Sequence, residues 1–227
     1  NRWGFFPCAS AVWRISEENL CKSSIRYIDY MKFRGSIGLL GNDAIGEWQW
    51  YQKYKIPDYS KDKIYPGAIF GGNALTGGLI PDVLPNPDIT WEKTRTINIG
   101  LDSKFLSDKL SFNFDYFFKH SYDILGDRMQ SLPTTFGAKM PTENYAVIDG
   151  HGWEVELEWN QRANNDFSYF VKGNLSFATN KVKVFDEAEN IRTYQSLIGH
   201  NYDRKDGMGY IATDIIRTQA DLDALPE

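Results

Sequence analysis

Three glutamates at alternate positions, Glu154, Glu156 and Glu158, form the densest group of potentially reactive side chains in the sequence. A pair of carboxylates is the usual acid and base of glycoside hydrolysis, so this spacing could indicate a glycosidase. However, residues two apart on a β-strand share one face, and such a row is more typical of a hydrated surface. The sequence also has no nucleophile elbow and no zinc-protease helix motif. We therefore expect no enzymatic activity.

Other residue types that could do chemistry lack the spacing they would need. His120, His151 and His200 do not have the spacing of metal ligands, so we expect them on a polar face or in loops, with no metal site. Cys8 and Cys21 could close a small loop, but two free thiols are the favoured interpretation. The glycine pairs at 71–72 and 77–78 are not followed by Lys-Ser or Lys-Thr, which favours a loop over a phosphate site.

The three glutamates belong to a segment that alternates strictly between apolar and polar residues. Trp153, Val155, Leu157 and Trp159 fall on the face opposite the glutamates, and the alternation restarts after a polar break at 161–166. This pattern predicts a β-hairpin with one apolar and one polar face. Similar alternation at 3–16, 31–41, 97–105 and 110–119 extends the prediction to about six antiparallel strands in an all-β fold.

The apolar face could meet either a protein core or lipid, and the connections favour lipid. They alternate in length in the order 17–30, 42–90, 106–109, 123–146, 161–166 and 181 onward. Tight turns at one end and elaborate loops at the other are typical of an outer-membrane barrel. The strands also have the length of about ten residues that crosses a bilayer at a tilt. The last residues, 218–225, could form a short capped helix.

Composition agrees with this interpretation and excludes other classes. The chain is 42% hydrophobic and 15% aromatic, and its net charge of −5 with no basic stripe argues against nucleic-acid binding. Aromatic residues cluster near strand ends, as membrane girdles do: Trp13, Phe105, Trp159, Phe167 and Tyr169 on the short-turn side, and Trp91 and Tyr122 on the long-loop side. No apolar helix-length run and no signal peptide is found, and the first residues read as the interior of a longer protein.

The polar face of such a sheet would line a hydrated lumen. The residues expected there are Asn113, Asp115, Glu154, Glu156, Glu158, Lys172 and Asn174. Trp48, Trp50 and Tyr51, in the long connection at 42–90, are the candidates for contact with a substrate such as a sugar ring. About six strands cannot close a barrel with a hydrated interior, so more protein must complete it.

A series of ordered segments resembles the SusC/RagA family of TonB-linked outer-membrane transporters. The segments are 1–7, 12–18, 32–38, 40–43, 85–92 (Pro-Asn-Pro-Asp-Ile-Thr-Trp-Glu), 98–102, Asn144, 152–154, 199–200, 209–210 and 218–221. The resemblance is dense to about residue 160 and looser over 42–84 and 181–227. One departure is Cys8, which stands where the family commonly has a small serine.

The resemblance implies that residues 1–227 form part of one transmembrane barrel of about 22 strands, with a plug domain and about sixteen strands outside this sequence. It implies the bacterial outer membrane and active import of oligosaccharides, or alternatively peptides. The implied partners are a SusD-like surface lipoprotein and the TonB complex. No cofactor is expected in this chain, although an Asp-rich motif that could bind metal would follow it. The alternatives are a soluble carbohydrate-binding β-domain and a passive porin.

Overall fold

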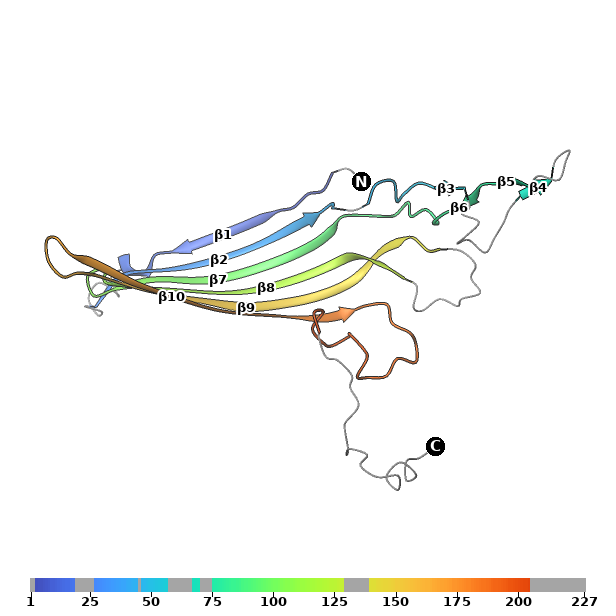
Figure 1. Ribbon diagram of the computed structural model, residues 1–227. Helices are drawn as coiled ribbons and strands as arrows, with labels where there is room; N and C mark the ends of the chain where they lie inside the picture. The colour runs from blue at the N-terminus through green and yellow to red at the C-terminus, as the bar shows by residue number, and fades with distance from the viewer. Residues whose placement is uncertain are drawn as a thin grey trace, which may run out of the picture.

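The computed structural model describes residues 3–18, 27–44, 46–56, 67–69, 75–128 and 139–204. Six strands form one antiparallel sheet in the order β1-β2-β7-β8-β9-β10 (Figure 1). Their bounds are β1 Cys8–Trp13, β2 Ile28–Asn42, β7 Glu92–Phe105, β8 Leu110–Asp127, β9 Thr142–Arg162 and β10 Ser168–Val184. Each strand of this sheet pairs with the strands nearest to it in the sequence, as the alternating pattern predicted.

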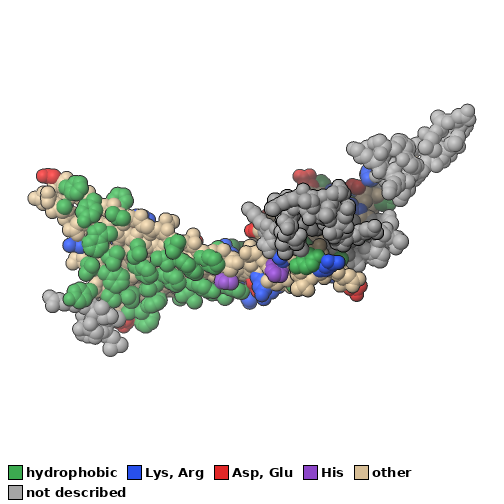
Figure 2. All heavy atoms as spheres, turned by 60° about the horizontal axis from the view of Figure 1, so that its bottom comes forward, with side chains coloured by type: hydrophobic (Ala, Val, Ile, Leu, Met, Phe, Trp, Pro, Cys, Tyr) green, Lys and Arg blue, Asp and Glu red, His purple; other side chains and the backbone are tan. Residues whose placement is uncertain are grey.

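The register brings the apolar positions of all six strands to one face. One continuous row consists of Trp13, Phe33, Leu101, Phe114, Val155 and Leu175, each paired with the next. Further rows on both sides of this row widen the apolar surface. On β7 it covers residues 97–105, and on β8 it covers residues 110–118. We call this surface the apolar band; it is the green surface of Figure 2.

The apolar band is covered by no other part of the described chain. Leu175 is 64% exposed, and among the described residues only Ile89, Ala146 and Val182 are buried hydrophobic residues. A soluble domain rarely exposes so large an apolar area. The band is about nine residues long on β7 and β8, which is the length needed to cross the hydrocarbon core of a bilayer.

The connections alternate between the two ends of the sheet. The β7–β8 turn at 106–109 and the β9–β10 turn at 163–167 lie at one end, and the segments 43–91 and 128–141 connect strands at the other. The tight turn is made with Leu106, Ser107 and Asp108 at φ 61, 60 and 61. The predicted asymmetry of short turns and long loops is therefore confirmed.

Part of the chain predicted to be irregular is strand. β8 continues to Asp127 and β9 begins at Thr142, so the connection is shorter than the predicted 123–146. A register shift between Ser121 and Ile124 breaks the alternation and explains the error. The long connection at 42–90 also holds short paired strands: β3 Tyr54–Lys55 with β6 Ile80–Pro81, and β4 Gly67–Ile69 with β5 Leu75–Gly77.

The first predicted strand, 3–16, is too long. β1 covers only Cys8–Trp13, and the 3-10 turn η1 Ile15–Glu17 follows it. Cys8 therefore begins its strand, where it is an exposed free thiol. Cys21 and the predicted helix at 218–225 lie outside the described residues. In the part of the chain that is described, no helix is both long and apolar enough to cross a membrane.

Candidate functional site

The residues predicted to line a lumen share the polar face of the sheet. One row across the strands is Lys32, Asp102, Asn113, Glu156 and Asn174, and the next is Arg34, Gly100, Asp115, Glu154 and Ser176. Glu158 and Lys172 are Cα partners one row further along. The sheet therefore brings together all seven predicted side chains on one surface. That this surface lines a lumen stays a prediction.

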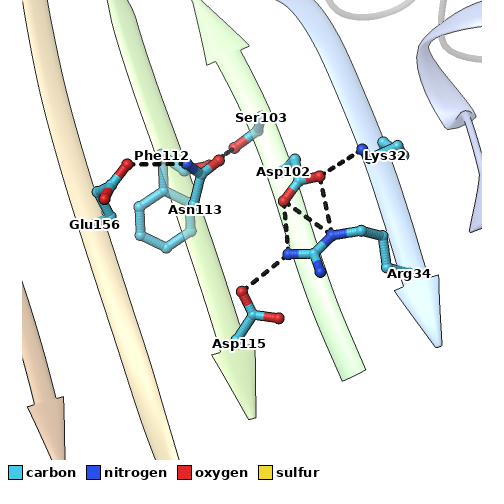
Figure 3. A network of polar contacts seen from close by, with 8 residues as sticks. All are labelled: Lys32, Arg34, Asp102, Ser103, Phe112, Asn113, Asp115 and Glu156. Carbon is cyan, nitrogen blue, oxygen red and sulfur yellow. Dashed lines mark hydrogen bonds and ion pairs between the residues drawn. The ribbon is translucent and has the colours of Figure 1, made fainter. Parts of the chain in front are cut away.

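An ion-pair network joins three strands on this face (Figure 3). Arg34 on β2 donates from Nη2 to Asp102 Oδ1 at 2.8 Å and from Nε to Asp102 Oδ2 at 3.0 Å, which is the fork geometry of a strong arginine–carboxylate pair. The same Nη2 donates to Asp115 on β8 at 2.9 Å. Lys32 adds an ion pair to Asp102 at 2.7 Å.

Gly100 makes the bridge from β2 to β8 possible. It lies on β7 in the same row, and a Cβ added there would come within 2.7 Å of both Arg34 Nη2 and Asp115 Oδ1. Such a contact is too short for any real side chain. The glycine therefore leaves the opening through which the guanidinium group crosses β7.

The carboxylates on the β9 side are less completely paired. Lys172 Nζ lies 2.9 Å from Glu156 Oε1 and 3.9 Å from Glu158 Oε2, and Asn113 donates to Glu156 at 3.3 Å. No described residue forms a hydrogen bond or ion pair with Glu154. Lysine and arginine side chains thus contact Asp102, Asp115, Glu156 and Glu158, whereas Glu154 has no such contact with any described residue. This mixture of paired and free carboxylates suits a hydrated wall.

Two of the three predicted aromatic contacts line a pocket at the long-loop end. Trp48, Trp50 and Tyr51 are 60%, 53% and 61% exposed, and Trp50 lies edge-on to Tyr51 with ring centroids 5.6 Å apart. Trp48 and Tyr51 contribute to the pocket wall, whereas Trp50 does not. The pocket wall also includes Lys53, Asp82, Asp127, Lys139 and Met140.

This pocket lies between the long loop and the start of β9, and hydrogen bonds hold the two together. Thr142 donates to Gln49 Oε1 at 2.5 Å, and Gln49 O accepts the backbone N–H of Asn86 at 3.1 Å. Leu84 N donates to Lys139 O at 3.0 Å. The four charged residues of the pocket wall come from three segments of the chain: the long loop (Lys53 and Asp82), the end of β8 (Asp127) and the start of the segment before β9 that the structure describes (Lys139). Because the segments are separate in the sequence, no local pattern indicated these residues.

Several residues that carried the family resemblance form a hydrogen-bonded junction beside this pocket. Asn144 Oδ1 accepts Thr90 N at 2.8 Å, and Asn144 Nδ2 donates to Thr90 O at 2.9 Å and Asp123 O at 2.8 Å. Glu92 accepts Leu125 N at 3.0 Å and Asn42 Nδ2 at 2.8 Å. These residues fix the loop ends to the strands, a role that no alternation pattern could indicate.

Asp123 occupies the register shift in β8 with φ 55. Its carboxylate accepts a hydrogen bond from Lys93 at 2.8 Å, and this bond is the main cause that raises the pKa of the Lys93 ammonium group.

The histidines were predicted on a polar face or in loops, but two of them lie elsewhere. His120 and His151 share the face of the apolar band, where His120 Nδ1 lies 2.6 Å from Asp149 Oδ1.

Among the residues described, no group of three or more His, Cys, Asp or Glu side chains could hold a metal ion.

Comparisons with known proteins agree with this geometry. A family model of TonB dependent receptor-like β-barrels matches residues 1–216. TonB-dependent receptor P39 of Formosa agariphila is 28% identical over 86% of this chain and 17% of its own length. TonB-dependent receptor SusC of Bacteroides thetaiotaomicron is 29% identical over 80% of this chain and 17% of its own length.

Solved structures give the same fold. The RagAB peptide importer in its closed-closed state superposes with a TM-score of 0.66 at 20% identity, over 86% of this chain and 20% of that chain. The chain thus spans less than a fifth of the curated relatives it matches. These relatives are receptors and transporters rather than enzymes, and the predicted resemblance to SusC/RagA proteins is confirmed. The chain belongs to the TonB dependent receptor-like β-barrel family, whose members are outer-membrane proteins.

Proposed function

We propose that this chain is a wall segment of a TonB-dependent outer-membrane importer of nutrients. The observation that carries the proposal is the division of one sheet into an exposed apolar band and a charged opposite face. A β-barrel in lipid needs this arrangement when its interior is hydrated. The family match supports the active, TonB-dependent form of transport over a passive porin.

Oligosaccharides are the proposed cargo, with peptides as the alternative. The pocket at the long-loop end combines the Trp48 and Tyr51 side chains with Lys53, Asp82 and Lys139. Aromatic faces pack against sugar rings, and a few polar groups around them fix the orientation of a ligand. The pocket opens at the end of the sheet that carries the long loops, which is the end that faces outward in barrels of this kind.

A SusD-like lipoprotein is the proposed partner on the same side. The similarity to SusC over most of this chain supports such a lid. In this proposal, cargo held under the lid first meets the Trp48–Tyr51 pocket and then passes the charged face that includes Glu154 and Asp115. The TonB complex would supply the energy through regions beyond this sequence.

Uptake by cells that carry the full-length transporter tests the proposal. The double variant Trp48→Ala/Tyr51→Ala should reduce binding and uptake of the oligosaccharide that supports growth by about tenfold, because stacked aromatic groups dominate the energy of such sites. The matched control is Tyr54→Ala, which removes an aromatic ring 63% exposed in the same loop but outside the pocket. Unchanged uptake in the double variant would remove the pocket from the import route, and a loss confined to peptide substrates would identify peptides as the cargo.

A further inference from the structure

Basic side chains gather on the outward face of the sheet, immediately beyond the long-loop end of the apolar band. The last largely apolar row contains Ile37, Ile97 and Phe118. The next row contains Arg95, His120, Asp149 and Lys181 as successive Cα partners on β7, β8, β9 and β10. We call Lys93, Arg95, His120, Lys181 and Lys183 the outward basic patch; Figure 2 shows blue and purple side chains following the green surface.

The acidic groups of this region neutralise only part of the patch. Asp149 lies 2.6 Å from His120 Nδ1 and 3.6 Å from Lys183 Nζ, and Asp123 binds Lys93 at 2.8 Å. Arg95 and Lys181 are exposed and form no ion pair with any residue that the structure describes. Their strands are three strand spacings apart, or about 14 Å. Two long cationic side chains therefore flank the His120–Asp149 pair without a partner of their own.

The opposite boundary of the apolar band differs in character. There the outward face continues with Gln161 and Tyr169, which are Cα partners and carry no charge. Aromatic and amide groups of this type suit a membrane–water boundary without attracting anions. Among the described residues of this face, Arg95 and Lys181 thus place unpaired positive charge at the boundary next to the long loops.

We propose that the outward basic patch binds the phosphate groups of an anionic glycolipid in the outer leaflet of the outer membrane. The patch adjoins the apolar band on the same face, so a molecule that meets both must combine an anionic headgroup with acyl chains. A dissolved anion would gain nothing from the band, and a lumen substrate would not reach this side of the sheet. The ring of Tyr122, 5.5 Å from that of His120, adds an aromatic group at the depth of the headgroups.

Binding of lipid A to the purified full-length transporter tests this proposal without any measurement of import. The protein is delipidated in mild detergent and titrated with lipid A in its phosphorylated and dephosphorylated forms. The variant Arg95→Gln/Lys181→Gln should bind phosphorylated lipid A more weakly, by about fivefold for each charge removed. Its affinity for the dephosphorylated form should match that of the wild type.

Lys119→Gln is the matched control. Lys119 is an exposed lysine next to His120 in the sequence, but it points to the polar face, where its ammonium group lies 5.2 Å from the Phe117 ring. This variant should retain wild-type affinity. The proposal fails if the double variant binds phosphorylated lipid A as the wild type does, or if Lys119→Gln loses as much.

Two measurements on the wild type keep the test decisive if a variant misfolds. Raising the salt concentration should weaken binding of phosphorylated lipid A, since surface charges are screened within about 10 Å at 0.1 M salt. Inorganic phosphate should bind far more weakly than lipid A. Equal affinity for the two lipid forms at low salt, or equal affinity for inorganic phosphate, would overturn the assignment to a lipid.

Discussion

Arg34 on β2 reaches past β7 to Asp115 on β8, with Nη2 2.9 Å from Oδ2. The contact joins two strands that are not neighbours in the sheet, so it resists sliding of three strands at once. Both side chains are partly exposed, at 35% and 25%. The contact with Asp115 is a single, partly screened ion pair, so its contribution to stability is about 1 kcal/mol at most.

Replacing Gly100 should break this contact. Gly100→Ala would place a Cβ 2.7 Å from Arg34 Nη2 and Asp115 Oδ1, and the guanidinium group would have to move away. We expect the full-length protein to lose about 1 kcal/mol of stability, measured as a lower midpoint of heat-induced unfolding in detergent. The control is Gly35→Ala, where an added Cβ meets nothing within 4 Å. Equal midpoints for the two variants would contradict the role of Gly100.

Asn144 should be required to hold the outer loops on the strands. Asn144→Ala removes the bonds to Thr90 and Asp123 and leaves their backbone groups without that partner. We expect a loss of about 2 kcal/mol and faster protease cleavage in the segment 43–91, measured on intact cells. Asn174→Ala, at an exposed asparagine on the polar face, should leave the cleavage rate unchanged. If cleavage does not accelerate in Asn144→Ala, the junction does not anchor the loop.

Two consecutive residues of β10 should respond oppositely to the same charge. Leu175 belongs to the middle row of the apolar band and is 64% exposed, whereas Asn174 lies on the polar face. Leu175→Arg should cost about 2–4 kcal/mol in the bilayer and reduce the folded fraction in the outer membrane. Asn174→Arg should fold normally. Heat-modifiable migration on gels measures the folded fraction of both variants. A loss of folding in Asn174→Arg but not in Leu175→Arg would mean that the two faces are assigned the wrong way round.

The two hairpins with strict alternation could be predicted from the sequence because side-chain direction on a strand follows a period of two. The segment 97–119 and the segment 153–177 therefore needed no tertiary information. The register shift between Ser121 and Ile124 hid the outer part of β8, since the pattern changes phase there. Bulges of this kind leave no reliable signal in a single sequence.

The candidate site was predictable in kind but not in detail. The alternating pattern gave the residues of the polar face. The aromatic content of the long loop pointed to Trp48, Trp50 and Tyr51, of which Trp48 and Tyr51 line the pocket. The bridge from Arg34 to Asp115 depends on how the β2, β7 and β8 strands are aligned, and the charged pocket wall depends on how a loop folds back. Neither follows from local pattern, because both join segments far apart in the chain.

β9 extends well beyond the apolar band toward the long loops. This strand has 21 residues, and its first residue, Thr142, is hydrogen-bonded to the loop that forms the pocket. Asp149 lies seven positions after Thr142, or about 23 Å along the strand. At Asp149 the face that carries the apolar band begins to carry charge. The sheet thus continues beyond the apolar band as a rigid collar. In the import route proposed above, cargo bound at its rim starts roughly two nanometres along the strand before the depth of the lipid chains.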